Sequence, residues 1–322
     1  MIFLANHPDF LTFVGNTAAE IKLPEELVIK DYWVTAVLRV LATSDELTGK
    51  IIFKGGTSLS KGWHLIDRFS EDIDILTTGP DFGAPYEKRS QREKLLKKVR
   101  DLILQQTPLQ IPDLHDPDYY LMDGHRYYAK IHFAWPQGDK DTVFLEMGFR
   151  GGPNPHSKVA INSFIGDHIL KLDKSVQDAL GKWAEDFTPF TMDLLEPSQT
   201  FVEKLLYLHT AVPKKVEDVR TRHLYDIVSI FESHSNIPDL LQSGGYKEQL
   251  RNAVEISNRW YGTTLDADAI DFKSSPILNL TEGQADVLAS SYKREGLLYF
   301  RGQKPFSELL KGLEKIKRKL KV

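Results

Sequence analysis

Two spacings of apolar residues divide the chain into parts of different structure. In the first 190 residues, some apolar side chains recur every three to four positions, as in helices, while others form short or alternating runs, as in strands. The elements predicted there are helices at 24–42, 57–66 and 86–106, strands at 51–54, 70–76 and 158–164, and a hairpin of 126–135 and 142–151 joined by the turn-like 136–141. After about Pro197 the spacing is helical throughout, which predicts helices at 200–212, 222–234, 246–262 and 306–322. The chain is therefore expected to consist of an α/β part, residues 1–190, and a helical part, residues 191–322.

The composition is that of a globular protein without thiol chemistry. Hydrophobic residues make up 41% and charged residues 27%, which argues against a disordered or fibrous chain. The net charge of −4 argues against a protein that coats nucleic acid through bulk positive charge, but it leaves room for local basic patches. The absence of cysteine excludes disulfides, thiolate zinc sites and cysteine nucleophiles.

Neither the start of the chain nor its interior has a membrane signal. The first residues lack the basic start and cleavage site of a signal peptide, and no apolar run approaches the ~18 residues that a membrane span needs. We therefore expect a cytoplasmic protein with no membrane partner. The serine-hydrolase, P-loop and dinucleotide-binding motifs are absent, and the ten histidines show no tight metal-ligand spacing.

A pair of carboxylates gives the first indication of chemistry. Asp72 and Asp74 lie two apart in the predicted strand at 70–76, so both side chains leave the same face of that strand. Two neighbouring carboxylates repel each other unless a cation lies between them, and such a pair can bind Mg²⁺. The simpler interpretation is a solvated strand face.

A glycine pair precedes the two aspartates. Gly55 and Gly56 follow the apolar run 51–54, and Thr57 and Ser58 open the next predicted helix. Glycine lets the backbone approach a phosphate, and the free N–H groups at a helix start attract one. Alone, two glycines would more often mark a tight turn. In the order strand, Gly-Gly, helix and Asp-x-Asp strand, they indicate a phosphoryl- or nucleotidyl-transfer site.

These segments resemble a known family. The stretch 53–75, with its Gly-Gly-Thr-Ser-Leu-Ser-Lys run and the Arg-Phe-Ser-Glu-Asp-Ile-Asp run at 68–74, closely resembles the signature of the AbiEii-type nucleotidyltransferase toxins, within the DNA polymerase β-like nucleotidyltransferase superfamily. The segments 30–33, 201–209 and 222–227 also look like motifs of that family. Beyond Ile227 no motif matches. The resemblance implies an α+β fold in which a nucleotidyltransferase mixed sheet flanked by helices is followed by a helical C-terminal domain.

The resemblance also implies a third carboxylate on a neighbouring strand. Glu146 is the best candidate, because it shares a strand face with Phe144 while Leu145 and Met147 lie on the other face. It could equally be an edge-strand charge that prevents aggregation. As a catalytic residue it would complete a Mg²⁺ site with Asp72 and Asp74 and lower the pKa of the acceptor hydroxyl.

Further residues acquire nucleotide-binding roles only from the resemblance. It implies that residues of the Gly-Gly run cradle the β- and γ-phosphates, that two lysines counter charge on the pyrophosphate, and that an Arg-x-x-x-Asp pair lies beside the nucleotide or acceptor. These residues are Gly55, Gly56, Thr57 and Ser58 for the cradle, Lys61 and Lys204 for the charge, and Arg222 and Asp226 for the pair. The alternatives are a solvated Lys204 whose stem covers apolar surface and a surface ion pair between Arg222 and Asp226.

By family analogy the chain is the toxin of a bacterial toxin-antitoxin pair, with an antitoxin encoded nearby, and phage defence is an expected role. It would transfer a nucleoside monophosphate from an NTP to an acceptor hydroxyl, with an RNA or tRNA 3′ end as the expected acceptor. RNA would bind through local clusters, namely Lys214, Lys215, Arg220 and Arg222, together with the C-terminal lysines. Two other functions remain open at this point: a non-catalytic nucleotide-binding sensor and a metal-dependent phosphohydrolase.

Overall fold

The computed structural model describes residues 2–70, 72–136, 142–299 and 302–321. The chain forms two compact units. The first unit consists of Met1–Thr57, Glu71–Phe149 and Ser157–Leu194, and the second of Ser58–Ser70, Arg150–His156 and Leu195–Val322. Each unit therefore contains segments that lie far apart in the sequence. None of the described helices is long and apolar enough to cross a membrane.

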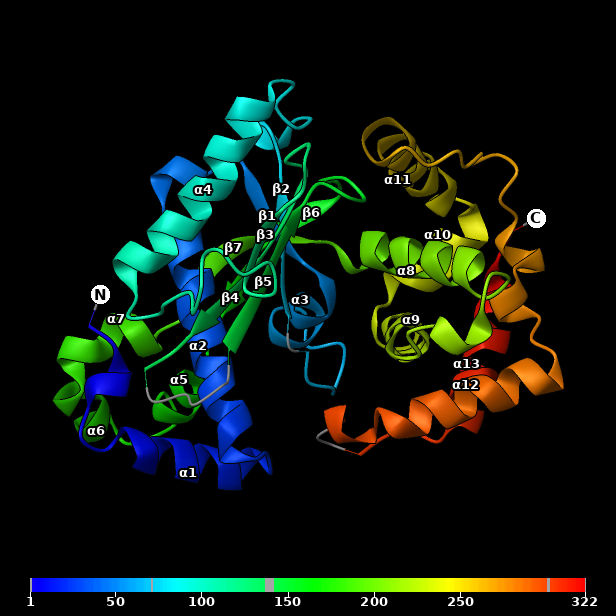
Figure 1. The fold of residues 1–322 in the computed structure, drawn as a ribbon. Helices are drawn as coiled ribbons and strands as arrows, with labels where there is room; N and C mark the ends of the chain where they lie inside the picture. Colours follow the sequence, from blue (N-terminus) through cyan, green and yellow to red (C-terminus); the bar gives the residue numbers. More distant parts are fainter. Residues whose placement is uncertain (1, 71, 137–141, 300–301, 322) are drawn as a thin grey trace. The chain divides into compact units, whose positions relative to one another are not determined.

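The first unit is built on a seven-stranded mixed sheet with the strand order β3-β4-β5-β2-β1-β7-β6 (Figure 1). The strands are β1 (Ile51–Lys54), β2 (Asp72–Thr77), β3 (Tyr120–Met122), β4 (Tyr128–Ala134), β5 (Thr142–Gly148), β6 (His156–Ile161) and β7 (Phe190–Leu195). β2 runs parallel to β5 and antiparallel to β1, whereas β4 and β5 form the predicted antiparallel hairpin. Of the turn predicted between them, residues 137–141 lie outside the described part of the chain. The mixed sheet confirms the predicted fold class.

The central strands have one buried face and one half-exposed face. In β4 and β5 every second residue is buried, as the alternating sequence pattern predicts. The buried face lies on the side of the sheet that carries α2 (Glu25–Ala42) and α4 (Arg89–Gln106) (Figure 1). Because the apolar residues all turn to that side, the polar residues of the same strands share the opposite face.

The other helices of the first unit are shorter or peripheral. They are α1 (Phe10–Ile21), α5 (Phe164–Ile169), α6 (Lys174–Ala179) and α7 (Ala184–Phe187). The short α3 (Gly55–Lys61) connects β1 with the segment before β2, and the boundary between the two units falls within it. It ends five residues before the end of the predicted helix at 57–66.

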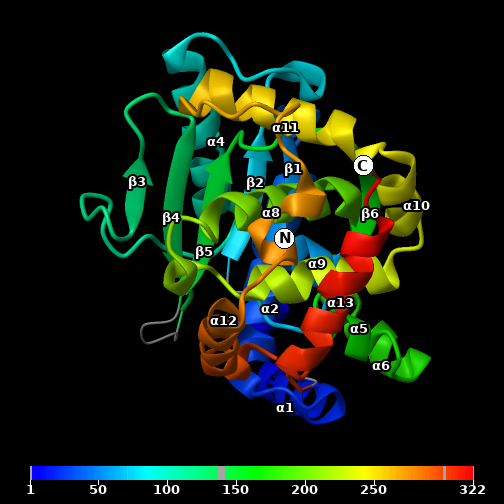
Figure 2. The same cartoon turned by 90° about the vertical axis from the view of Figure 1, so that its right-hand side faces the viewer.

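The second unit is helical, as predicted for the C-terminal part (Figure 2). Its helices are α8 (Pro197–Ala211), α9 (Arg222–Ser233), α10 (Asn236–Ser243), α11 (Tyr246–Tyr261), α12 (Glu282–Arg294) and α13 (Phe306–Lys319). α9 packs against both α8 and α13. A Cβ atom on Gly312 of α13 would come within 2.4 Å of Val228 Cγ1 on α9, so the close approach of these two helices requires glycine.

Candidate active site

Three carboxylate residues share the half-exposed face of the sheet in the first unit. Asp72 and Asp74 alternate with the buried Ile73 along β2, and both aspartates are half-exposed. Asp74 is paired in register with Glu146 of the parallel strand β5. Neighbouring strands lie about 4.8 Å apart, so this register places the two side chains next to each other. The predicted association of Glu146 with the aspartate pair is thus present in the strand pairing.

The backbone at Gly55 forms a seat for the Asp74 carboxylate. Gly55 has φ +79°, in the left-handed region, and a Cβ atom at this position would lie 1.8 Å from Asp74 Oδ2. Thr57 Oγ1, two residues further along α3, donates a hydrogen bond of 2.5 Å to the backbone oxygen of Asp72. The start of α3 is therefore hydrogen-bonded to β2 at Asp72 and packs closely against Asp74, and glycine at position 55 is a steric requirement.

Tyr128 on β4 contacts the third carboxylate. Its hydroxyl donates a hydrogen bond of 2.7 Å to Glu146 Oε1. Burial raises the pKa of Tyr128, and the hydrogen bond to Glu146 and the charge of Asp74 raise it further, so the hydroxyl remains a proton donor at neutral pH. Sequence reasoning missed this residue: the hairpin was predicted without its register, and it is the observed pairing of Tyr128 with Gly148 that makes Tyr128 a diagonal neighbour of Glu146.

The second unit contains a buried ionic cluster. Arg68 Nε and Nη2 donate to the two carboxylate oxygens of Asp226 at 2.7 and 2.6 Å, which is a bidentate geometry. Lys204 Nζ on α8 lies 2.8 Å from Asp226 Oδ2 and 2.9 Å from His223 Nδ1 on α9. The side chains of Arg68 and Asp226 are only 2% and 0% exposed. These groups therefore interact almost without competition from water.

Protonation states in this cluster follow from burial and charge. Burial alone would raise the pKa of Asp226, but the nearby Arg68 and Lys204 outweigh it and hold that pKa well below the ordinary range. Burial, and then the charge of Lys204, lowers the pKa of His223 well below its usual value. His223 is thus neutral at pH 7, so its Nδ1 can accept a hydrogen bond from the Lys204 ammonium.

The cluster overturns two of the alternatives drawn from sequence. Lys204 is 8% exposed and ion-paired, so it is not a solvated surface lysine. Asp226 is fully buried and bound to Arg68 and Lys204, so the alternative of a surface ion pair between Arg222 and Asp226 is wrong. Arg68 belongs to the family-like run at 68–74 but received no role from sequence, because its partner lies 158 positions away.

Comparison with known proteins identifies the family. A family model described as "Nucleotidyl transferase AbiEii toxin, Type IV TA system" matches residues 38–310. The chain belongs to the AbiEii nucleotidyl transferase toxin family. It is accordingly a nucleotidyltransferase and the toxin of a type IV toxin-antitoxin system, which implies a nucleotide substrate and an antitoxin.

Among the solved structures that match, one is similar to this AbiEii chain over most of its length. It is described as "Crystal structure of putative nucleotidyltransferase from H. pylori" and shares 17% sequence identity, with a TM-score of 0.46. The similarity covers 92% of this chain and 97% of that chain. No curated protein matches.

The donor set on the sheet suits the metal that AbiEii-like transferases are expected to use. Mg²⁺ prefers oxygen ligands and is commonly held by one or two carboxylates, with substrate phosphates and water as the other ligands. Within the described residues, no three His, Asp or Glu side chains are already arranged to hold a metal ion. Asp72 and Asp74, with Asp74 seated on Gly55, fit an ion that brings phosphate oxygens with it.

The remaining residues that were predicted to bind nucleotide lie on α3 and at the start of α9. In the first unit Gly55, Gly56 and Thr57 open α3, beside the aspartates. In the second unit the next residues of α3, Ser58 and Lys61, are buried. Arg222 begins α9 and is half-exposed. Their contact with nucleotide stays a prediction.

We expect Gly55→Ala to reduce nucleotidyl transfer by about a hundredfold or more. The new Cβ would displace the Asp74 carboxylate, and positional errors of about 1 Å can cost that much. The left-handed backbone adds a stability cost of about 1–2 kcal/mol. Gly49→Ala is the matched control, because Gly49 has φ +69° but its Cβ would make only ordinary contacts at 3.4 Å. Activity is measured by pyrophosphate release. Equal losses in the two variants would contradict the claim that Gly55 positions the Asp74 carboxylate.

Tyr128→Phe should raise the Mg²⁺ concentration needed for half-maximal transfer by about tenfold. The loss of a hydrogen bond that orients a metal-binding carboxylate typically lowers metal affinity by about 10- to 100-fold. The Mg²⁺ concentration for half-maximal pyrophosphate release measures this effect. Tyr120→Phe on β3 is the control, since its hydroxyl accepts a hydrogen bond from Arg100 in the same sheet. If both variants keep the wild-type Mg²⁺ dependence, Tyr128 does not orient Glu146.

Proposed function

We propose that this chain transfers a nucleoside monophosphate from an NTP to the 3′ hydroxyl of an RNA and releases pyrophosphate, with Mg²⁺ held by Asp72 and Asp74 and with Glu146 helping to bind a second ion. The observation that carries the proposal is the seating of the Asp74 carboxylate on Gly55, in register with Glu146. Membership of the AbiEii family supplies the reaction type. The metal and the acceptor are inferred from the donor chemistry and from the distribution of charge.

The residues on the sheet divide the work of the proposed reaction. When bound, Mg²⁺ would neutralise charge on the transferring phosphate. Asp72 and Asp74 would hold that ion, and Gly55 and Gly56 are proposed to cradle the β- and γ-phosphates. Glu146 receives the Tyr128 proton donor on Oε1, which leaves Oε2 to accept a hydrogen bond from the attacking hydroxyl.

Roles for residues of the second unit extend the proposal. Lys61 and Lys204 are proposed to counter charge on the leaving pyrophosphate, and Arg222 and Asp226 to lie beside the nucleotide or acceptor. The Asp226 carboxylate already binds both Arg68 and Lys204. Its direct part in this arrangement is therefore to fix the Lys204 ammonium in position.

An RNA acceptor is supported by local rather than overall charge. The net charge is −4, so binding has to rest on clusters such as Lys214, Arg220 and Arg222. Lys215 of the predicted cluster forms an exposed ion pair of 2.9 Å with Asp218, which reduces its contribution.

The experiment that tests the acceptor uses each of the four NTPs, labelled at the α-phosphate, with total cellular RNA. We expect label in RNA that RNase removes. Label that survives RNase but is lost on protease treatment would refute the RNA acceptor while leaving nucleotidyl transfer intact. Label in neither polymer, with release of inorganic phosphate, would favour the phosphohydrolase alternative.

A further inference from the structure

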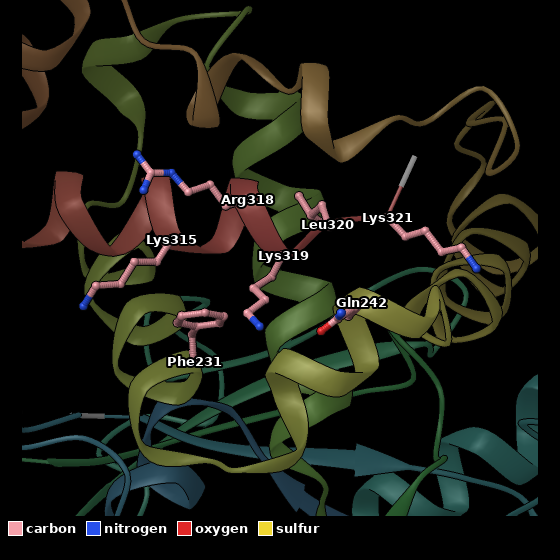
Figure 3. A pocket seen from close by; sticks show the side chains of 7 residues that line it. All are labelled: Phe231, Gln242, Lys315, Arg318, Lys319, Leu320 and Lys321. Atoms are coloured by element: carbon pink, nitrogen blue, oxygen red, sulfur yellow. The ribbon is translucent and has the colours of Figure 1, made fainter.

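A basic hollow lies at the C-terminal end of α13, within the second unit. Figure 3 shows the side chains that line it. Its volume is about 580 Å³. The lining residues come from α9, α10, α13 and the two residues that follow α13: Phe231, Gln242, Lys315, Arg318, Lys319, Leu320 and Lys321. The hollow thus combines four cationic side chains with an aromatic ring and an amide. The sequence predicts that the C-terminal lysines contribute to RNA binding, and the hollow adds an aromatic ring and an amide beside them.

The sequence of α13 explains why the cations gather there. Leu309, Leu313 and Ile316 are buried and turn to the core of the second unit, so the charged positions are left on the outer face. Cations in the last turn also interact favourably with the helix dipole, which is an ordinary reason for some of them. Helix stabilisation alone, however, does not require Lys321, which lies beyond the helix end, or the aromatic ring of Phe231 beside these cations.

Nearby carboxylates offset only part of this charge. Lys315 Nζ lies 3.4 Å from Glu232 Oε1, and Arg318 Nε lies 3.1 Å from Glu314 Oε1. Both pairs are exposed, and exposed pairs exchange partners easily. Between residues 302 and 321, and elsewhere in the described chain, no carboxylate lies within ion-pair distance of Lys319 or Lys321. The hollow therefore carries an excess of positive charge that favours an anionic ligand.

The directions of the lining side chains indicate which kind of anionic ligand fits the hollow, a nucleic-acid strand or a compact anion. Figure 3 shows Lys319 reaching between Phe231 and Gln242, whereas Arg318 and Lys321 point to different sides. Lys315 and Lys319 are about 6 Å apart along the helix axis, from a rise of about 1.5 Å per residue. Cations spread in this way suit several separated phosphates better than one converging phosphate group.

We propose that this hollow binds single-stranded RNA, with backbone phosphates on Lys315, Lys319 and Lys321 and one base against the half-buried ring of Phe231. A positively charged groove with an aromatic stacking surface is the usual way in which proteins hold single strands without reading their sequence. Gln242 can hydrogen-bond to a base edge of any type. That the strand is RNA rests on the proposed function, whereas the binding itself does not.

The test is fluorescence anisotropy of the full chain with a labelled oligo-U 12-mer and no NTP. Lys315→Glu combined with Lys319→Glu should raise the Kd by about tenfold or more. Loss of two contacts should also reduce the log-log salt slope by about 1.4, at roughly 0.7 per phosphate on a single strand. The matched control combines Lys247→Glu with Lys293→Glu, which are exposed lysines on α11 and α12. Equal effects of the two double variants would overturn the proposal.

Phe231 tests the stacking contact separately. Phe231→Leu keeps an apolar side chain but removes the π-face, and should weaken binding by about fivefold or more, while Phe231→Tyr should restore it. Loss of binding in both, with unchanged folding, would overturn the stacking role.

Two other probes identify the ligand. Equal affinity for oligo-dT would refute the assignment to RNA, and tight binding of free ATP would refute a strand. The anisotropy assay contains no NTP, so it measures binding of the strand and not nucleotidyl transfer. Failure of the strand to bind is therefore distinguishable from failure of the proposed transfer reaction, which pyrophosphate release measures.

Discussion

Asp74→Asn is expected to abolish pyrophosphate release, by at least about a thousandfold, while the protein remains folded. A thousandfold loss corresponds to about 4 kcal/mol of transition-state stabilisation, which is a reasonable share for a carboxylate that holds the metal. Asn has the same size as Asp, so the seat on Gly55 is kept while the charge is lost. Asp72→Asn should behave alike. Thermal melting and pyrophosphate release, measured on the same preparations, give the two readouts.

The melting temperature should stay equal or rise in either variant. Asp72 and Asp74 leave the same strand face, so neutralising one of them removes a repulsion from the metal-free protein. Asp193→Asn is the control, because Asp193 lies on β7 of the same sheet and pairs with Lys158 at 3.6 Å. Activity near the wild-type rate in Asp74→Asn, or an equal loss in Asp193→Asn, would contradict the assignment of the aspartate pair.

Asp226→Asn should destabilise the second unit by about 3–5 kcal/mol, which is the usual cost of leaving a buried charge without its partner. Arg68 would lose the carboxylate that its Nε and Nη2 bind, and its side chain is only 2% exposed. Hydrogen exchange of α8 and α9 reports on this unit alone, which avoids treating two units as one transition. Asp239→Asn on the exposed face of α10 is the control. Unchanged protection in Asp226→Asn would show that the cluster adds nothing to stability.

The same cluster predicts how stability depends on pH. The pKa of Asp226 is lowered in the fold, so its stabilisation is complete above the unfolded pKa of about 3.9 and is lost as the pH falls towards the folded pKa. The pKa of His223 is also lowered, so the unfolded chain takes up a proton first and stability begins to fall below about pH 6.5. The hydrogen-exchange protection factors of the second unit, which are corrected for the pH dependence of intrinsic exchange, should therefore fall in both windows. His223→Gln should remove the upper window, and Asp226→Asn the lower one.

The parts of the site that depend on local periodicity could be predicted from sequence. The alternation along β2 places Asp72 and Asp74 on one face, and the hairpin pattern places Glu146 on the same kind of face of β5. The strand order that brings β5 beside β2 came from family resemblance, because apolar spacing does not determine which strands pair. The left-handed backbone at Gly55 likewise depends on where the Asp74 carboxylate packs.

Other features were beyond sequence reasoning because their partners are distant along the chain. The Arg68–Asp226 pair spans 158 residues, and neither residue signals the other. α12 could have been found, since Thr281 and Gln284 form a capping box at its start. β7 has an alternating pattern of apolar and polar residues but was missed between short helices.

The central claim is nucleotidyl transfer rather than hydrolysis, and the fate of the two ends of one NTP tests it most directly. The purified chain is incubated with Mg²⁺, RNA and an NTP labelled at either the α- or the γ-phosphate, and the products are separated and counted. The account predicts that the γ-label appears only in pyrophosphate, that the α-label enters the acceptor in equal amount, and that Asp72→Asn and Asp74→Asn form neither product. Release of the γ-label as inorganic phosphate, with no α-label transferred, would contradict it.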